Sequence, residues 1–237
     1  MAPRPTKTTI INMKLLECFA GSRSFGNEAD AMEWEVCSID IKAFDKIDII
    51  ADMEFVTIND LPFIPDVGVF MPPCTSYSIA AISHHRSMPG YIPKSDFAKK
   101  SDRLLENTVK LIKDILLVYP NFKFYIENPV GCMRKMEIMK QFDRATIYYC
   151  RYGDIRMKPT DIWTNNLKTM YNPNGWQPRK KCWNGNTKCH HEASPRGSRT
   201  GTQGLKNDYE RSKNPVNLVL DILNTHALTG EELTYKP

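Results

Sequence analysis

Short apolar runs alternate with amphipathic stretches along the first two thirds of the chain. Six runs that are apolar and bounded by turn residues predict strands, at residues 15–20, 34–41, 48–52, 67–71, 122–126 and 146–150. Helical spacing of apolar residues predicts helices at 25–33, 101–118, 133–142 and 214–226. Because such alternation requires crossover connections, we expect an α/β fold, with a Rossmann-like, mainly parallel sheet covered by helices on both faces.

Charge is distributed unevenly between the two parts of the chain. Residues 165–213 have a net charge of +7, the remainder has −2, and the late segment has few Val, Ile or Leu with which to build a core. It is either a solvated loop region or an insert that faces a polyanion. We therefore expect an extension at 1–13, a main domain at 14–164, a basic insert at 165–213, and a helix within 214–237 that packs back on the main domain.

Composition excludes several classes of protein. With 41% hydrophobic and 25% charged residues, a largely disordered chain is not expected. No stretch approaches the roughly 20 apolar residues that span a bilayer, and residues 1–13 lack the apolar core of a secretory signal. Seven cysteines, an odd number, do not suggest a secreted disulfide framework. We expect reduced thiols, a cytoplasmic location and no membrane partner.

The turn after the first predicted strand has the sequence FAGSRSFG, residues 19–26. Small residues at a strand-to-helix turn let the backbone approach a ligand, and the helix start offers free N–H groups. Asp40, at the end of the second strand, is placed to bind ribose hydroxyls. The same features occur in ordinary structural turns, so the pattern alone permits a nucleotide site without requiring one.

Two further strand ends carry reactive side chains. Cys74 follows the strand at 67–71 in the sequence PPCTSYS, where two prolines restrict the backbone, and the polar stretch up to residue 100 is placed to close over it. Glu127 leaves an apolar strand in the sequence FYIENP, where desolvation would raise the carboxyl pKa and favour proton donation. The alternatives are a structural cysteine and a turn with a solvated carboxylate. Since all these strand ends meet at one edge of a parallel sheet, together they predict an active site.

The ordered set resembles the cytosine-C5 DNA methyltransferases that use S-adenosylmethionine. Residues 19–21 with Gly26 are similar to the first motif of that family, Pro73-Cys74 to its nucleophile motif, and Glu127-Asn128 to its Glu-Asn-Val motif. Residues 152–158 are similar to a diverged Gln-x-Arg-x-Arg segment. The match covers about residues 14–165, and the basic insert falls where the family places its target-recognition region. The short insert is similar to that of compact members from phages and plasmids.

The sequence departs from the family pattern in three places. Ser22, Arg23 and Ser24 replace the extra glycines after FAG, and Pro129 replaces the usual valine. In the Gln-x-Arg-x-Arg segment, Arg156, Lys158 and Thr160 replace the Gln, Arg and Arg of the family. These changes affect the shape of the cofactor turn and the contacts that this segment makes to the base.

The resemblance implies a mechanism and a set of residues. The Cys74 thiolate would add to C6 of a cytosine flipped out of duplex DNA, Glu127 would stabilise the charge at N3, and C5 would accept the methyl group, leaving S-adenosylhomocysteine. Arg156 and Lys158 complete the expected catalytic set. Phe19 would flank the adenine, Gly21 would approach the methionine moiety, Asp40 would bind the ribose and Asp52 the adenine amino group. The expected cofactor set also includes Ala20, Ser22, Ile41 and Pro73.

The expected partner is double-stranded DNA, bound by a monomer. The residues expected to contact DNA are polar or basic and lie after Cys74 or in the insert: Ser78, Arg86, Arg179, Lys180, Lys181, Arg196 and Arg199. Two alternatives remain open. One is an enzyme that methylates pyrimidine C5 in RNA or in a free nucleotide, and the other is a DNA-binding relative without activity.

The basic insert also contains candidate ligands for a metal. Cys182 and Cys189 lie close to His191, and two thiolates with an imidazole are typical Zn²⁺ ligands. A metal would order a segment poor in core residues. The spacing is not a CxxC pair and offers no obvious fourth ligand, so the alternative is a solvated histidine with half-buried cysteines.

Overall fold

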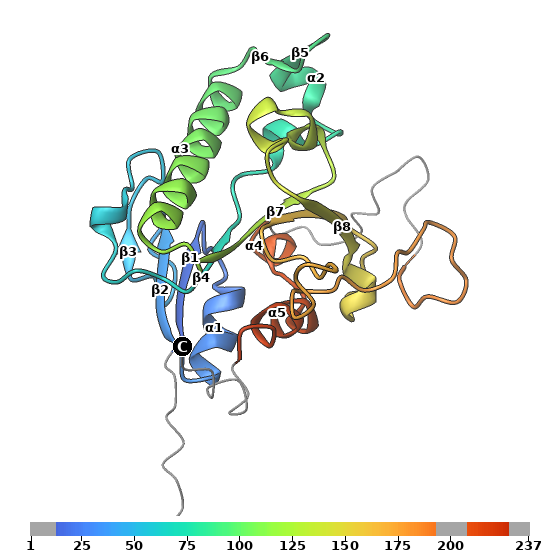
Figure 1. The fold of residues 1–237 in the computed structure, drawn as a ribbon. Helices are drawn as coiled ribbons and strands as arrows, with labels where there is room; N and C mark the ends of the chain where they lie inside the picture. The colour runs from blue at the N-terminus through green and yellow to red at the C-terminus, as the bar shows by residue number, and fades with distance from the viewer. Residues whose placement is uncertain (1–12, 193–207, 228–237) are drawn as a thin grey trace, which may run out of the picture.

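The computed structural model describes residues 13–192 and 208–227. A seven-stranded sheet with the order β3-β2-β1-β4-β7-β9-β8 runs through the molecule (Figure 1). Six strands share one direction and β9 runs against them. The strands are β1 (Lys14–Cys18), β2 (Glu35–Asp40), β3 (Ile49–Ile50), β4 (Val67–Phe70), β7 (Lys123–Pro129), β8 (Arg144–Tyr148) and β9 (Pro159–Thr164).

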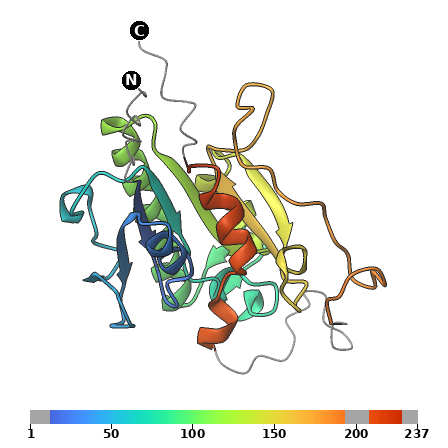
Figure 2. The same ribbon diagram turned by 90° about the horizontal axis from the view of Figure 1, so that it is seen from below.

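Helices cover both faces of this sheet, as Figures 1 and 2 show. The long helix α3 (Asp96–Val118) packs on one face, and α1 (Ser24–Ala31) and α5 (Val216–Leu223) pack on the other. Strand residues alternate between the two cores, so that Leu16 faces α3 while Leu15 faces α1 and α5. The protein is therefore an α/β fold with a mostly parallel sheet, as the hydrophobic pattern predicts.

Helix α3 shows how local sequence sets these elements. The Ser95 hydroxyl accepts the N–H of Ala98 at 3.1 Å and caps the first turn. Apolar residues at helical spacing, among them Leu105, Ile112 and Ile115, are buried against the sheet. The cap places the helix start five residues before the predicted one, since the first turn carries Asp96, Lys99 and Lys100 and too few apolar residues to show helical spacing.

Short elements complete the described chain. They are η1 (Ile58–Asp60), η2 (Thr75–Tyr77), α2 (Ile82–His85), β5 (Arg86–Ser87), β6 (Ile92–Pro93), η3 (Cys132–Lys135), η4 (Glu137–Met139), η5 (Tyr149–Tyr152) and α4 (Asp208–Ser212). Strands β5 and β6 pair with each other outside the main sheet. Within residues 13–192 and 208–227, no helix has both the length and the hydropathy needed to cross a bilayer.

The hydrophobic pattern locates the parallel strands correctly but is wrong at residues 133–142. This stretch forms the two 3₁₀ turns η3 and η4 instead of the predicted helix. Met133, Met136 and Met139 recur every third residue, and each carbonyl of the first two accepts the N–H three residues later. That spacing fits a turn of three residues better than one of 3.6. The pattern also fails to mark β9, whose sequence PTDIWT mixes polar and apolar residues.

The first part of the predicted insert contains a residue that is buried in the core. Trp176 lies within the segment after β9 and is buried in the cluster beneath α5, where its ring meets that of Tyr125 edge to face. The start of the insert is thus anchored on the main domain, although its composition suggests little capacity for core formation. Helix α5 packs back on the sheet, as the apolar spacing of its residues predicts.

Candidate active site

The turn between β1 and α1 has the strained backbone that close approach to a ligand requires. Phe19, Gly21 and Arg23 all have positive φ angles, of 56°, 49° and 55°. The Gly21 N–H donates to Asp40 Oδ2 at 3.0 Å, which joins the ends of β1 and β2. Arg23 adopts the left-handed conformation at a position where a glycine would be expected, and its buried side chain pairs with Asp30.

Glu17 holds the start of α1 in place, a role that the motif analysis missed. Its carboxylate accepts the N–H groups of Phe25 and Gly26 at 3.0 and 2.9 Å. Burial raises the pKa of Glu17 to about 7, against the effect of these hydrogen bonds. A Cβ at Gly26 would lie 2.8 Å from this carboxylate, so the glycine is needed for the close packing of the turn.

A pocket lies beside this turn at the carboxyl ends of β1, β2, β3 and β4. Five of the predicted cofactor residues line it, namely Phe19, Asp40, Ile41, Asp52 and Pro73. Four other lining residues were not predicted: Ala51, Met53, Lys100 and Leu104. The order of the sheet reverses between β1 and β4, and ligands of doubly wound sheets bind at that point.

The remaining cofactor candidates lie outside the lining of this pocket. Ala20 is buried and its N–H donates to the Ile39 carbonyl, while the Ser22 hydroxyl lies 3.0 Å from that of Ser24.

Asp52 lines the pocket but already forms an ion pair. Lys100 Nζ lies 2.6 Å from Asp52 Oδ2, and this hydrogen bond lowers the pKa of Asp52. Lys100 comes from α3, and a residue 48 positions away gives no sequence signal for the pair.

The Cys74 loop is connected directly to the end of β7. Cys74 is half-buried and lies between Pro73 and the 3₁₀ turn η2. The side-chain amide of Asn128 donates to the Pro72 carbonyl at 2.9 Å. This bond fixes the loop that carries the thiol against the residue that follows Glu127, so the two predicted catalytic motifs are joined.

Glu127 lies in a buried polar cluster at the end of β7. Its side chain is 11% exposed, and Lys158 Nζ lies 3.9 Å from Oε1. The Tyr149 hydroxyl lies 2.9 Å from the same oxygen and 2.7 Å from Asn214 Oδ1. Sequence reasoning missed Tyr149 and Asn214, because η5 and the segment before α5 meet Glu127 only in the folded chain.

Lys158 connects the predicted acid with the predicted nucleophile. Burial lowers the pKa of Lys158, while the Glu127 carboxyl and the Cys74 thiol both oppose that shift. The ammonium also lies over the Tyr149 ring, 4.3 Å from its centroid. Cys74 is therefore near enough to act on the same cation that faces Glu127. Arg156, the other predicted residue of this segment, forms an ion pair with Asp154.

One of the predicted DNA contacts is corrected. The Arg86 side chain is fully buried, forms an ion pair with Asp102 at 2.6 Å and donates to the Ser76 carbonyl, so no DNA contact is assigned to it. A side chain that is inaccessible to water is inaccessible to a phosphate. Ser78 is half-buried and forms an isolated bridge to Gly131.

The other predicted DNA contacts lie in the basic insert. Arg179 is exposed and pairs with Asp221 at 2.7 Å, and its guanidinium stacks on Tyr152. Lys180 and Lys181 are exposed. Arg196 and Arg199 lie outside the described residues. The surface that the structure describes therefore offers three basic side chains of the predicted set.

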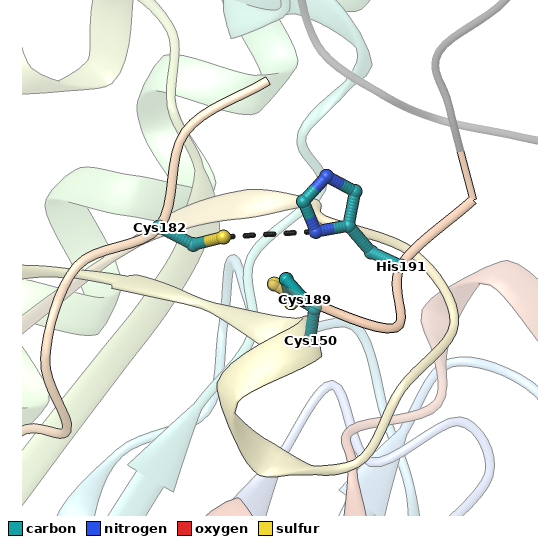
Figure 3. Close-up of side chains that lie close together, drawn as sticks. All are labelled: Cys150, Cys182, Cys189 and His191. Carbon is teal, nitrogen blue, oxygen red and sulfur yellow. Dashed lines mark hydrogen bonds between the residues drawn. The ribbon is translucent and has the colours of Figure 1, made fainter. Parts of the chain in front are cut away.

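The three predicted metal ligands lie together, and a fourth side chain joins them. Cys182, Cys189 and His191 meet Cys150, which comes from η5, as Figure 3 shows. Burial opposes ionisation of the Cys189 thiol, but hydrogen bonds from His191, Cys150 and Cys182 lower its pKa to about 6. Burial raises the pKa of the Cys150 thiol. Sequence spacing gave no reason to associate Cys150 with the insert.

Comparisons with known proteins assign no family to the chain. No family model matches it, and no curated protein matches it. Among solved structures, it is similar to the PH0226 protein from Pyrococcus horikoshii OT3, with 14% identity over 59% of this chain and 58% of that chain. The TM-score of this match is 0.31, a likeness too remote to support an argument.

Proposed function

We propose that this protein is a DNA methyltransferase that transfers a methyl group from S-adenosylmethionine to C5 of cytosine, on a Rossmann-like methyltransferase fold. One observation carries the proposal. The Cys74 loop, Glu127 and Lys158 gather at the sheet edge that also holds the pocket beside the β1–α1 turn. Five of the residues that the family resemblance assigns to the cofactor line that pocket.

The pocket fits the chemistry of the methyl donor. Phe19 offers an aromatic face and Asp40 a carboxylate for hydroxyl groups, and the left-handed backbone at Gly21 lies in the turn between them. The volume is about 170 Å³, smaller than the roughly 300 Å³ of pockets that hold a whole drug-sized ligand. It would therefore enclose one part of the cofactor. S-adenosylmethionine held there would supply the methyl group and leave as S-adenosylhomocysteine.

Cys74 and Glu127 supply the chemistry that makes C5 reactive. Addition of the Cys74 thiolate to C6 forms a carbon–sulfur bond and turns the ring into an enamine-like species. Carbon C5 of this species is a nucleophile that can attack the methyl group. Glu127 would donate a proton or a hydrogen bond at N3, where negative charge accumulates. After methylation, loss of the C5 proton expels Cys74 and restores the double bond. Lys158 Nζ, 3.9 Å from Glu127 Oε1, would stabilise negative charge on the carboxylate and, by electrostatic attraction, on the Cys74 thiolate.

The contacts of Tyr149 fix the position of the Glu127 carboxyl. The Tyr149 hydroxyl has one proton and lies within hydrogen-bond distance of two acceptors, Glu127 Oε1 and Asn214 Oδ1. The network therefore ties Glu127 to η5 and to the segment before α5. Burial strongly raises the pKa of Tyr149, so the phenol stays neutral in this network.

Access to C6 requires that the cytosine leave the stacked duplex. Flipping costs about a few kcal/mol, which contacts to the DNA backbone must offset. The exposed Lys180 and Lys181, with Arg179, supply positive charge on the described surface for such contacts. A basic surface favours a polynucleotide over a free nucleotide as the substrate.

The proposal is tested by the transfer of tritium-labelled methyl groups to DNA of mixed sequence. We expect label in 5-methylcytosine with the wild-type protein, and none above background with Cys74→Ala. Cys37→Ala is the matched control, because Cys37 is buried in β2 away from the site and its loss should leave transfer intact. DNA that contains 5-fluorocytosine should trap a covalent complex with the wild type only, since the C5 fluorine cannot leave as a proton does.

Wild-type rates with Cys74→Ala, or label on a nitrogen atom, would overturn the proposed mechanism. Label in RNA or in free nucleotides and none in DNA would support the alternative pyrimidine-C5 enzyme. Salt-dependent DNA binding without any transfer would support a relative that binds DNA and has no activity.

A further inference from the structure

The side chains of Cys150, Cys182, Cys189 and His191 form a compact group away from the proposed active site. Figure 3 shows the four side chains converging, one from η5 and three from the basic segment, which we define as residues 179–192. Their ligand atoms all lie within 4.8 Å of one another. Three thiols and an imidazole at one point form a donor set that the proposed methyl transfer does not use.

The chemistry and geometry of this group match one metal better than others. Thiolate and imidazole ligands without carboxylates select Zn²⁺ over Mg²⁺ or Ca²⁺. Tetrahedral bonds of about 2.3 Å to sulfur and about 2.0 Å to nitrogen place those two ligand atoms about 3.5 Å apart. Cys182 Sγ lies 3.6 Å from His191 Nδ1. This pair already has the separation that a shared zinc ion imposes.

The turn that carries Cys182 and Cys189 supplies a hydrogen bond to a ligand sulfur, as the surroundings of structural metal sites do. The Asn186 amide donates to Cys182 Sγ at 3.5 Å, a contact that orients a thiolate and offsets its charge. The Asn186 N–H donates to the Trp183 carbonyl and the Cys189 N–H to the Asn186 carbonyl, which folds residues 182–189 back on themselves. Gly185, with φ of +82°, permits this tight turn.

Few apolar contacts hold the basic segment, whose other connections are polar and include Arg179 with Asp221 and His190 with the Asp154 carbonyl. Its buried apolar contacts are confined to a cluster of Cys150, Met157 and Cys182, with Tyr148 and Cys189 against it. Trp183 is 62% exposed. A segment with so few apolar contacts requires another source of folding free energy, and metal binding supplies it.

We propose that these four residues bind a structural zinc ion that clamps the basic segment onto η5. Four protein ligands complete a tetrahedron and leave no position for water or substrate, so the site is structural. Cys150 lies next to Tyr149, which contacts Glu127. The Glu192 N–H donates to the Ile155 carbonyl beside Arg156, so the ion fixes the basic segment next to the proposed active site.

The test measures metal in the purified full-length protein. We expect one zinc ion per chain after dialysis against metal-free buffer, and a cobalt-substituted protein with thiolate-to-metal charge-transfer bands and intense tetrahedral d–d bands. Cys150→Ser and His191→Ala should each lower the bound zinc at least tenfold. His190→Ala is the control, because its ring contacts the Asp154 carbonyl and lies outside the cluster, and it should retain the metal.

A wild-type protein without zinc and without cobalt thiolate bands would overturn the proposal. So would a disulfide between two of these cysteines, or zinc content unchanged in both ligand variants. If the ligand variants fail to fold, the cobalt spectrum of the wild type still decides. Since metal content is measured without substrate, these outcomes are independent of whether the protein methylates DNA.

Discussion

Two irregular segments flank the proposed active site, and they are held in different ways. Residues 75–95 follow Cys74 and are fixed by the buried guanidinium of Arg86, which bonds to Asp102 on α3 and to the Ser76 carbonyl. The basic segment is attached by the ion pair of Arg179 with Asp221, by the hydrogen bond from the Glu192 N–H to the Ile155 carbonyl, and by the proposed zinc site. The first segment also contributes the buried Tyr77 to the main core, whereas the buried apolar contacts of the basic segment are confined to the small cluster around Cys182.

The two segments differ in the exposure of their basic side chains. In the first segment the arginine is turned inward, stacks 4.4 Å from the Tyr77 ring centroid and serves the fold. In the second segment, Lys180 and Lys181 are exposed, while Arg179 pairs with Asp221. The two segments thus differ in whether their basic side chains are accessible to solvent.

The largest effect is expected from Asp102→Asn. This change leaves the Arg86 guanidinium buried without a counter-charge and should lower the free energy of unfolding by about 3–5 kcal/mol, as measured by urea denaturation. Asp96→Asn is the control on the same helix, because the Asp96 side chain is fully exposed. Its cost should stay below about 1 kcal/mol. Equal losses in the two variants would show that Arg86 does not anchor the segment.

Titration of His226 should change the stability of the fold as a whole. His226 is buried next to the Tyr125 hydroxyl at 2.9 Å, and burial lowers its pKa from 6.5 to about 4. The unfolded chain therefore binds a proton more readily, so stability present above pH 6.5 is lost as the pH falls toward 4. The loss should approach about 3 kcal/mol.

His226→Gln, which cannot titrate, should remove that part of the pH dependence in urea denaturation between pH 7 and 4. Because His226 lies in the core beneath α5, hydrogen exchange of both segments should respond together. An unchanged pH profile in the variant would mean that other groups cause the acid instability.

The smallest effect on stability is expected from Lys180→Ala combined with Lys181→Ala. These side chains are exposed, so the free energy of unfolding should change by no more than about 0.5 kcal/mol each. If they contact phosphates, the slope of log affinity for DNA against log salt should fall by roughly one for each lysine. Lys113→Ala, exposed on α3, is the control and should leave the slope unchanged. An unchanged slope in the double variant would remove both lysines from the DNA-binding surface.

Sequence predicts those parts of the fold and site that depend on residues close together in the chain. Phe19, Asp40, Cys74 and Glu127 each follow an apolar run, and parallel strands bring their carboxyl ends to one edge. That reasoning requires no knowledge of long-range contacts. It also explains why the pocket is lined by predicted residues on the strand ends, while Lys100 was missed.

The parts that could not be predicted depend on partners far apart in the chain. Cys150 lies 32 positions before Cys182, and Asn214 lies 65 positions after Tyr149, so no local spacing associates them. Arginine side chains are usually exposed, and only the placement of Asp102 on α3 explains why that of Arg86 is buried. In each case a polar side chain is placed by a contact between segments that are far apart in the chain.

The reversed direction of β9 has a consequence for how such a protein can diversify. Lys158 immediately precedes this strand, and Asn165 immediately follows it at the opposite edge of the sheet, where its amide bonds to the backbone at the start of β7. Chain that is added or removed after Asn165 therefore starts from the far rim, a full strand length from the ammonium group. A change of length after Asn165 would therefore leave Lys158 and the pairing of β7 with β9 in register.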